Sequence, residues 1–154
     1  MAWSIGRRVM LGVLVGALLS TGACAKNRLA REQRREARTP VGEWRLVKIG
    51  DDPVDAIIPP ESRPPALAIH PDGSVTGFTG VNQIRGLLDY HGFARGGFEM
   101  SDPVTTRMAG PPQMMAVEER FLNALAGRRS YRVEEGVLSI RGGKEPVLEF
   151  VRAQ

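Results

Sequence analysis

The side chains able to do acid–base or nucleophilic chemistry are few in this chain of 154 residues. His70 and His91 are the two imidazoles, and each falls at a predicted turn, outside any triad motif and without metal-ligand spacing. The acidic pairs 51–52 and 134–135 fall in expected loops, and we interpret them as solvated charges because neighbouring strand residues point to opposite faces. The sequence therefore predicts no catalytic residue, no metal site and no cofactor. A small hydrolase centred on the two histidines remains an alternative.

The single cysteine, Cys24, ends a segment with the order of a secretory signal peptide. Two arginines give a positive start, residues 9–19 carry no charge, and four small or hydroxyl residues follow. Small residues directly before a cysteine resemble the lipobox of bacterial lipoproteins. The resemblance implies cleavage before Cys24 and acyl chains on its sulfur and new amino group. Thr21 departs from the pattern, since lipoboxes most often have Leu there.

Two other outcomes are open for this segment. Ordinary cleavage near Ala23 or Ala25 would release a soluble protein. An uncleaved anchor is disfavoured, because residues 9–19 are fewer than the roughly 20 needed to span a bilayer. If Cys24 is lipidated, the absence of Asp at the next position favours the outer membrane of a Gram-negative cell, facing the periplasm. The expected organisation is a lipoprotein signal peptide (1–23), a lipidated basic tether (24–42) and a folded domain (43–151).

The basic charge of the chain is concentrated before the domain. Residues 26–38 hold six basic and two acidic side chains, whereas residues 39–154 hold 13 Lys and Arg against 15 Asp and Glu. The domain thus lacks the basic balance that nucleic-acid binding needs, and we expect no nucleic-acid partner. The tether is either a solvated spacer or a contact for anionic lipid head groups.

The domain alternates short apolar segments with turns. We expect strands over 43–49, 66–70, 74–79, 83–90, 96–100, 130–133, 137–141 and 146–151. One helix is expected after Pro111 and Pro112, and it ends before Gly127. Its apolar residues Met114, Val117, Phe121, Leu122 and Leu125 recur at helical spacing. The pattern predicts an α+β fold, an antiparallel sheet of about seven or eight strands curled into a half-open barrel with one helix packed on it.

Two stretches of this domain have special composition. Gly77, Gly80 and Gly86 fall within or between strands, where glycine marks bends or close backbone approach, and Asn82 suits a hydrogen-bonded corner. A phosphate-binding loop is disfavoured, because no Lys-Ser/Thr ending or helix follows. The Pro-rich segment 51–65 contains apolar side chains that either fold back on the core or line a pocket, and they include Val54, Ile57 and Ile58.

Taken in order, these segments resemble the META domain family, which includes the HslJ-like heat-shock proteins. The resemblance rests on Trp44-Arg45-Leu46, on 72–82 with Gly86 after it, on 106–111, on the helix with Glu118 or Glu119 and Phe121, and on the closing hairpin. It implies structural motif positions at Trp44, Gly77, Gly80, Asn82, Gly86, Thr106, Met108 and Phe121. Arg107 is expected to pair with Glu118 or Glu119. Family members often have cysteines where this chain has Val81 and Gly110, and the resemblance implies that those cysteines pair.

The resemblance implies a role in envelope stress or drug tolerance without a settled biochemical activity. We therefore expect a non-enzymatic envelope lipoprotein that binds the membrane through its anchor and has a binding or assembly role. One version is similar to secretin pilotins, with an apolar ligand or peptide in a groove beside Ile57 and Ile58. Another is an inhibitor or chaperone of an envelope protein that acts through the loop 59–65.

Overall fold

The computed structural model describes residues 28–29, 31–32 and 38–153. The chain divides into two compact units, 1–34 and 35–154, and residues 28–29 and 31–32 of the first are helical. Cys24 and the expected signal peptide lie outside the described residues. Among the helices that are described, none has both the length and the apolar character needed to cross a bilayer.

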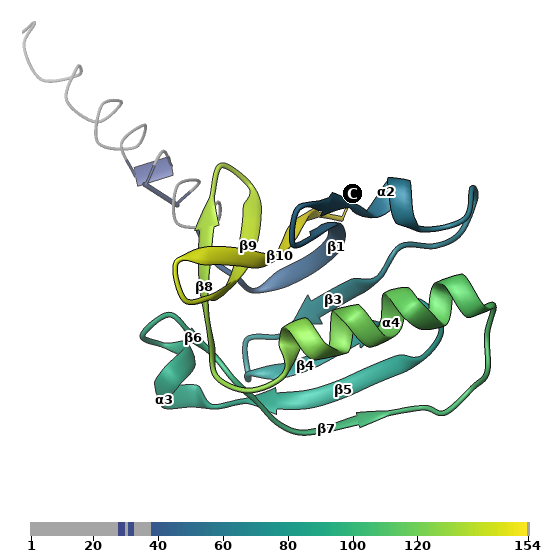
Figure 1. The fold of residues 1–154 in the computed structure, drawn as a ribbon. Coiled ribbons are helices and arrows are strands. Elements are labelled where there is room, and N and C mark those ends of the chain that lie inside the picture. Colours follow the sequence, from purple (N-terminus) through teal and green to yellow (C-terminus); the bar gives the residue numbers. More distant parts are fainter. Residues whose placement is uncertain (1–27, 30, 33–37, 154) are drawn as a thin grey trace, which may run out of the picture. The chain divides into compact units, whose positions relative to one another are not determined.

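The second unit is built of short strands with three helices between them. In chain order the elements are β1 (Gly42–Ile49), β2 (Asp52–Pro53), α2 (Val54–Ile57), β3 (Ala66–Ile69), β4 (Ser74–Phe78), β5 (Gln83–Leu88), α3 (Tyr90–Phe93), β6 (Gly97–Phe98), β7 (Met100–Thr105), α4 (Pro112–Leu125), β8 (Arg129–Glu134), β9 (Val137–Gly142) and β10 (Glu145–Arg152). Figure 1 shows α4 lying across the sheet formed by these strands.

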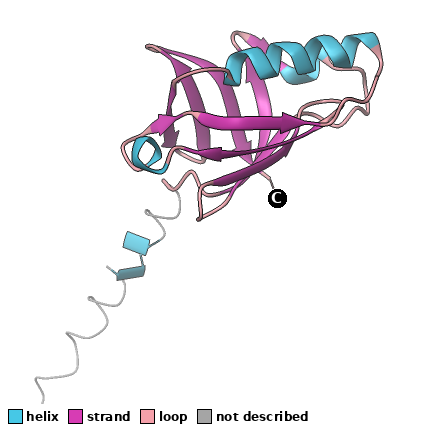
Figure 2. Cartoon of the chain, turned by 90° about the horizontal axis from the view of Figure 1, so that it is seen from below, coloured by secondary structure: helices cyan, strands magenta, loops and turns pink. Residues whose placement is uncertain are grey.

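The strands form one antiparallel sheet in the order β6-β8-β9-β10-β1-β3-β4-β5-β7, with β2 beside β1. The two ends of this order, β6 and β7, are separated in the chain by Glu99 alone. The sheet therefore curls back on itself into a nearly closed barrel, which Figure 2 shows from below. In the described chain β6 pairs only with β8 and β7 pairs only with β5, so the barrel is open between the two edge strands β6 and β7.

The core fills the inside of this barrel, and α4 covers it. Inward residues of nearly every strand are buried, and α4 adds Met114, Val117, Phe121 and Leu125 from one face. The ring of Phe121 meets that of Phe150 edge-on, with 6.2 Å between centroids. The helix begins at Pro112, where a missing N–H costs nothing, and ends before Gly127, which has φ 74°. Among the described residues, all members of the core lie between Trp44 and Phe150.

Two of the glycines are required by close packing. A Cβ on Gly77 would lie 2.4 Å from the carbonyl oxygen of Ala66 on the neighbouring strand. A Cβ on Gly86 would lie 2.5 Å from the Met100 side chain, at the irregularity in the β5–β7 pairing. Glycine thus lets neighbouring strands or side chains approach the backbone at both places. This confirms a close approach at Gly77 and an irregular strand at Gly86.

The predicted fold class is confirmed, with some elements misplaced. The described chain has nine or ten strands instead of seven or eight, because β2 forms within the expected loop and β7 continues through 101–105, which the sequence left unassigned. Tyr90, predicted as the last residue of a strand, instead begins the single-turn helix α3, and His91, predicted at a turn, lies in the same helix. The segment 51–65, predicted as a loop, contains β2 and the short helix α2.

Candidate functional site

The glycine-rich motif forms a tight turn between β4 and β5. The backbone N–H of Thr79 donates to the carbonyl oxygen of Asn82 at 2.8 Å, which closes the turn. Gly80 has φ 120°, a conformation that residues with a side chain rarely adopt. Thr79 and Asn82 are both buried, at 0% and 2% exposure, so their polar groups need partners inside the protein.

Glu118 of α4 provides those partners. The residue is 7% exposed and its carboxylate points into the turn. One carboxylate oxygen, Oε2, accepts hydrogen bonds from the Thr79 hydroxyl and from the backbone N–H groups of Asn82 (2.8 Å) and Val81 (3.3 Å). The other oxygen, Oε1, accepts one from the side-chain amide of Asn82 at 2.8 Å. A single carboxylate therefore attaches the helix to the turn.

Asn82 extends this network to a third segment. Its Oδ1 accepts from the Thr106 hydroxyl at 2.8 Å and from the backbone N–H of Met108 at 2.7 Å. Its Nδ2 donates to the Met108 carbonyl at 3.2 Å as well as to Glu118. All four hydrogen-bonding positions of the amide are thus used. The Asn82 side chain therefore joins three parts of the domain, namely the turn, α4, and the segment that follows β7. We call Thr79, Asn82, Thr106 and Glu118 the Asn82 cluster.

The electrostatics of Glu118 favour its charged form. Burial by itself raises the pKa of this carboxyl, but the hydrogen bonds from Thr79, Asn82 and Val81 outweigh burial, and the pKa lies below its ordinary value of 4.5. No ion pair of Glu118 is found in the described part of the chain. Because its oxygens accept bonds from the protein's own groups, the carboxylate is committed to structure and does not present itself to a substrate.

The motif residues named from the sequence divide into two groups. Gly80 lies in the turn, and Thr106 and the Met108 backbone bond to the Asn82 side chain, which in turn donates to Glu118. The others support the barrel: Trp44 and Phe121 are fully buried, and Gly77 and Gly86 lie within strands.

The expected ion pair of Arg107 is wrong for Glu118, whose partners are amide and hydroxyl groups, and the described residues include no pair between Arg107 and Glu119. Arg107 is exposed. Helical spacing could have identified the correct acid, because residue 118 lies on the same face as Met114, Phe121 and Leu125, whereas residue 119 faces outward.

Around the turn after β3, the His70 ring, the Asp72 carboxylate and the Ser74 hydroxyl are not arranged as a triad. His70 Nε2 lies 3.3 Å from the Thr76 hydroxyl. Asp72 accepts hydrogen bonds from the Ser74 hydroxyl (2.7 Å) and backbone N–H (2.9 Å). The acid therefore bonds directly to the serine, whereas in a triad the histidine would lie between them. His91 lies in α3. Within 28–29, 31–32 and 38–153, no three His, Cys, Asp or Glu side chains are grouped to hold a metal ion.

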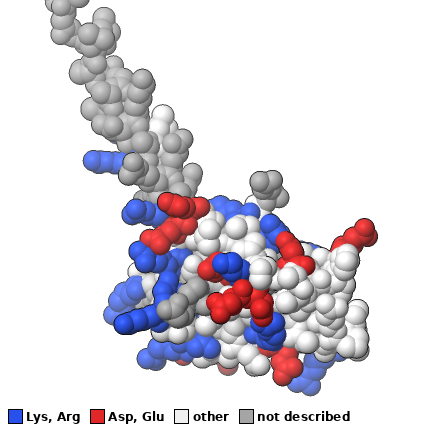
Figure 3. Space-filling model, turned by 45° about the horizontal axis from the view of Figure 1, so that its top comes forward, with Lys and Arg blue, Asp and Glu red and all other residues white. Residues whose placement is uncertain are grey.

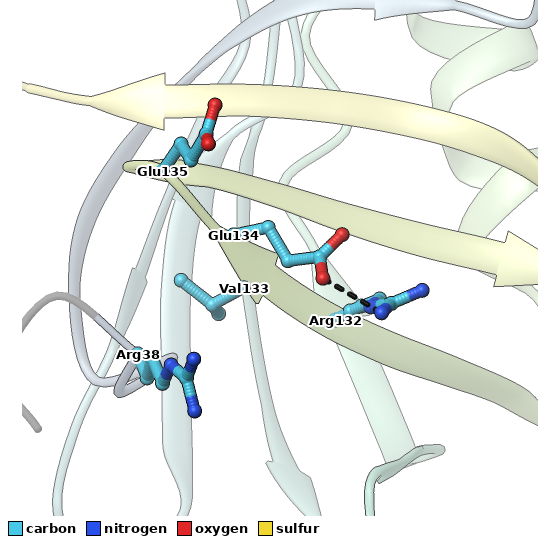
Figure 4. A pocket seen from close by; sticks show the side chains of 5 residues that line it. All are labelled: Arg38, Arg132, Val133, Glu134 and Glu135. Atoms are coloured by element: carbon cyan, nitrogen blue, oxygen red, sulfur yellow. Dashed lines mark ion pairs between the residues drawn. The ribbon is translucent and has the colours of Figure 1, made fainter. Parts of the chain in front are cut away.

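The surface has one large polar hollow near the start of the domain. It has a volume of about 650 Å³ and is lined by Arg38, Arg132, Val133, Glu134 and Glu135. Figure 4 shows that Arg132 is paired with Glu134, at 2.7 Å, and that the lining side chains carry both signs of charge. A hollow of this composition selects neither anions nor cations.

A second hollow is apolar and lies at the open side of the barrel. It has about 400 Å³ between the C-terminal half of α4 and strands β5 and β7. Its lining contains no charged residue: Ile84, Met100, Pro103, Thr105, Leu122, Leu125, Ala126 and Gly127. Ile84 and Leu125 are 3% and 5% exposed, so the hollow reaches the core. Among the described strands, none pairs with β7 on this side, which leaves the hollow open.

The sequence predicted a groove beside Ile57 and Ile58, but the apolar hollow lies elsewhere, beside α4, β5 and β7. Ile58 is 8% exposed and belongs to the core, and Ile57 packs partly against it. The backbone carbonyl of Ile57 accepts a hydrogen bond from Gln113 at 3.1 Å. Of the two alternatives for this segment, the structure therefore has the one in which it folds back on the core.

The end of the expected tether is attached to the domain. Trp44 Nε1 donates to the carbonyl of Pro40 at 2.7 Å. The guanidinium of Arg152 stacks 4.5 Å above the Trp44 ring and donates to the carbonyl of Thr39 at 3.0 Å. These hydrogen bonds thus hold Thr39 and Pro40 to the domain.

Comparisons with known proteins agree with this architecture. The family model described as META domain matches residues 37–154. No curated protein matches the chain. An NMR structure of a protein is similar at 15% identity and a TM-score of 0.55, covering 71% of this chain and 87% of the other. An NMR structure of a protein from Burkholderia xenovorans is similar at 19% identity and a TM-score of 0.53, covering 97% and 99%. At these identities the likeness concerns the fold alone.

Proposed function

This chain belongs to the META domain family, and we propose that it is a lipid-anchored protein of the bacterial cell envelope that binds a partner and catalyses no reaction. The observation that carries the proposal is the uncharged hollow of about 400 Å³ beside α4. Its size and apolar lining are typical of binding sites. The buried polar side chains of the Asn82 cluster, Thr79, Asn82 and Glu118, are occupied by hydrogen bonds within the protein.

The anchoring is supported by the order of the N-terminal residues. A positive start, an uncharged segment and small residues precede Cys24, and residues 26–38 are mostly basic or polar. Because Trp44 and Arg152 hold residues 39–41 to the domain, the chain between Cys24 and Arg38 is the tether. Fully extended, these residues reach roughly 50 Å, so the domain would work close to the membrane. Ala25, rather than Asp, at the second mature position favours the outer membrane and a domain facing the periplasm.

The experiment is mass spectrometry of the full-length protein, purified in mild detergent from membranes of its own host. We expect an N-terminal peptide that begins at Cys24 and carries acyl chains on the sulfur and the amino group. The control is Cys24→Ser, which keeps the signal segment and should lose both the acyl chains and the membrane fraction. A wild-type protein cleaved near Ala25 and recovered without lipid would refute the anchor. Stoichiometric companions in the wild-type preparation would identify partners for the binding role.

A further inference from the structure

α4 is apolar on two opposite faces. The first face is buried in the barrel and contains Phe121. A second row of apolar residues lies on the outward side, and we call it the outer row: Pro112, Met115, Ala116, Leu122 and Ala126. Leu122 is half-buried and the other four are exposed, Met115 at 37%. A helix that buries only one face normally carries charged residues on the other. Leu122 also packs partly against the core, so the four exposed residues of the outer row are the part that the fold does not account for.

One charge interrupts the outer row. Glu119 is exposed at its centre, and Asn123 is the other polar residue on that side. Arg120 does not belong to the row, because its guanidinium turns toward β2 and pairs with Asp52 at 2.6 Å. In Figure 3 charged side chains crowd the left and centre of the view, and the right part shows few. Figure 1 places the beginning of α4 and its flanking loops on that right side.

Two hollows lie along the outer row and share Leu122. One is the apolar hollow beside β7, of about 400 Å³. The other, of about 620 Å³, is lined by Pro112, Met115, Ala116, Glu118, Glu119, Leu122 and Asn123. Helices pack by placing side chains of one into depressions on the surface of the other. The 14 residues of α4 give a surface about 21 Å long, which suits a partner helix of a few turns.

We infer that the outer row is the docking surface for one amphipathic helix of another protein, with a Lys or Arg of that helix opposite Glu119. The inference rests on the proposed binding role and names its surface and partner class. A second copy fits poorly, because a symmetric pair that buries residues 112–126 places Glu119 against its own copy. A membrane surface also fits poorly, since helices that lie on membranes are rich in Lys and Arg on their polar face.

The test places a photo-crosslinking amino acid at position 116 of the full-length protein in its own host. Ala116 is exposed within the outer row, so the replacement should leave the unfolding temperature unchanged. The matched control is position 87, since Leu87 is also exposed and apolar (60%) but lies on β5. We expect position 116, and not 87, to capture one protein. The captured peptide should have apolar residues at helical spacing and at least one Lys or Arg among them.

Charge reversal then tests whether a basic residue of the partner helix lies opposite Glu119. Glu119→Lys should lower the crosslinking yield about tenfold, and reversing the partner's basic residue to Glu should restore it. Capture of a second copy, of lipid or of nothing at position 116 would overturn the inference, as would failure of the compensating reversal. Each of these failures is independent of the acylation of Cys24, so an intact anchor with no captured helix refutes only the docking surface.

Discussion

Replacing Glu118 by Gln tests whether the Asn82 cluster holds the domain together. Gln has the same shape as Glu, but one of its two terminal groups is an N–H donor. If its oxygen takes the place of Oε2, its amide nitrogen faces Asn82 Nδ2, which now donates to Oε1 at 2.8 Å. The N–H groups of the introduced glutamine amide and of the Asn82 amide then face each other, and neither finds an acceptor there. Rotating the Asn82 amide would not help, because Oδ1 already accepts from Thr106 and Met108.

The expected cost follows from the bonds that change. The hydrogen bonds to a charged oxygen become neutral ones, which reduces each by about 1 kcal/mol, and one buried donor loses its partner at about 1–3 kcal/mol. The smaller desolvation of a neutral amide offsets part of this loss. We expect Glu118→Gln to lower the free energy of unfolding by about 3 kcal/mol, a large share of the 5–15 kcal/mol typical of a domain.

The assay is urea unfolding followed by the fluorescence of Trp44, which is fully buried in the native state. The control is Glu119→Gln, the same chemical change one residue later on the exposed side, with an expected effect below about 0.5 kcal/mol. Because the folded-state pKa of Glu118 is lowered, its stabilising effect is present above pH 4.5 and is lost as the pH falls through that folded-state pKa. The difference between wild type and Glu118→Gln should therefore shrink on acidification below pH 4.5. Equal stability of Glu118→Gln and Glu119→Gln at pH 7 would refute this reasoning.

Three further changes have expected outcomes. A Cβ on Gly110 would lie 3.3 Å from the Cβ of Val81, slightly below the roughly 3.5–4.5 Å of disulfides. Val81→Cys with Gly110→Cys should therefore form a bond that closes a loop of about 30 residues and adds about 3 kcal/mol of stability, seen as a higher melting temperature that dithiothreitol abolishes. Gly77→Ala should cost at least about 2 kcal/mol in urea unfolding, because its Cβ would lie 2.4 Å from the Ala66 carbonyl oxygen. Asn82→Asp should oppose two carboxylates at the 2.8 Å contact with Glu118, so this variant should gain stability from pH 7 to pH 5, whereas an unchanged pH profile would contradict that geometry.

Much of the fold could be predicted because its signals are local. The strands around Leu46, Leu138 and Phe150 alternate apolar and polar residues, and α4 has apolar residues at helical spacing between two prolines and a glycine. Strand β7 had no such signal. Its residues 100–105 include Pro103 and the positive-φ Asp102, so it is extended because β5 pairs with it and not because of its own preference.

The sequence by itself determined which residues of the regular strands and of α4 face the core and where α4 begins and ends, since hydrophobic periodicity and turn residues act over a few positions. Tertiary structure decided what Asn82 and Glu118 do, because their contact joins segments 36 residues apart and depends on how α4 crosses the barrel. It also decided that Ile58 is buried while the outer row of α4 stays exposed. Both sets are apolar, and only the arrangement of the layers around them determines which one is covered.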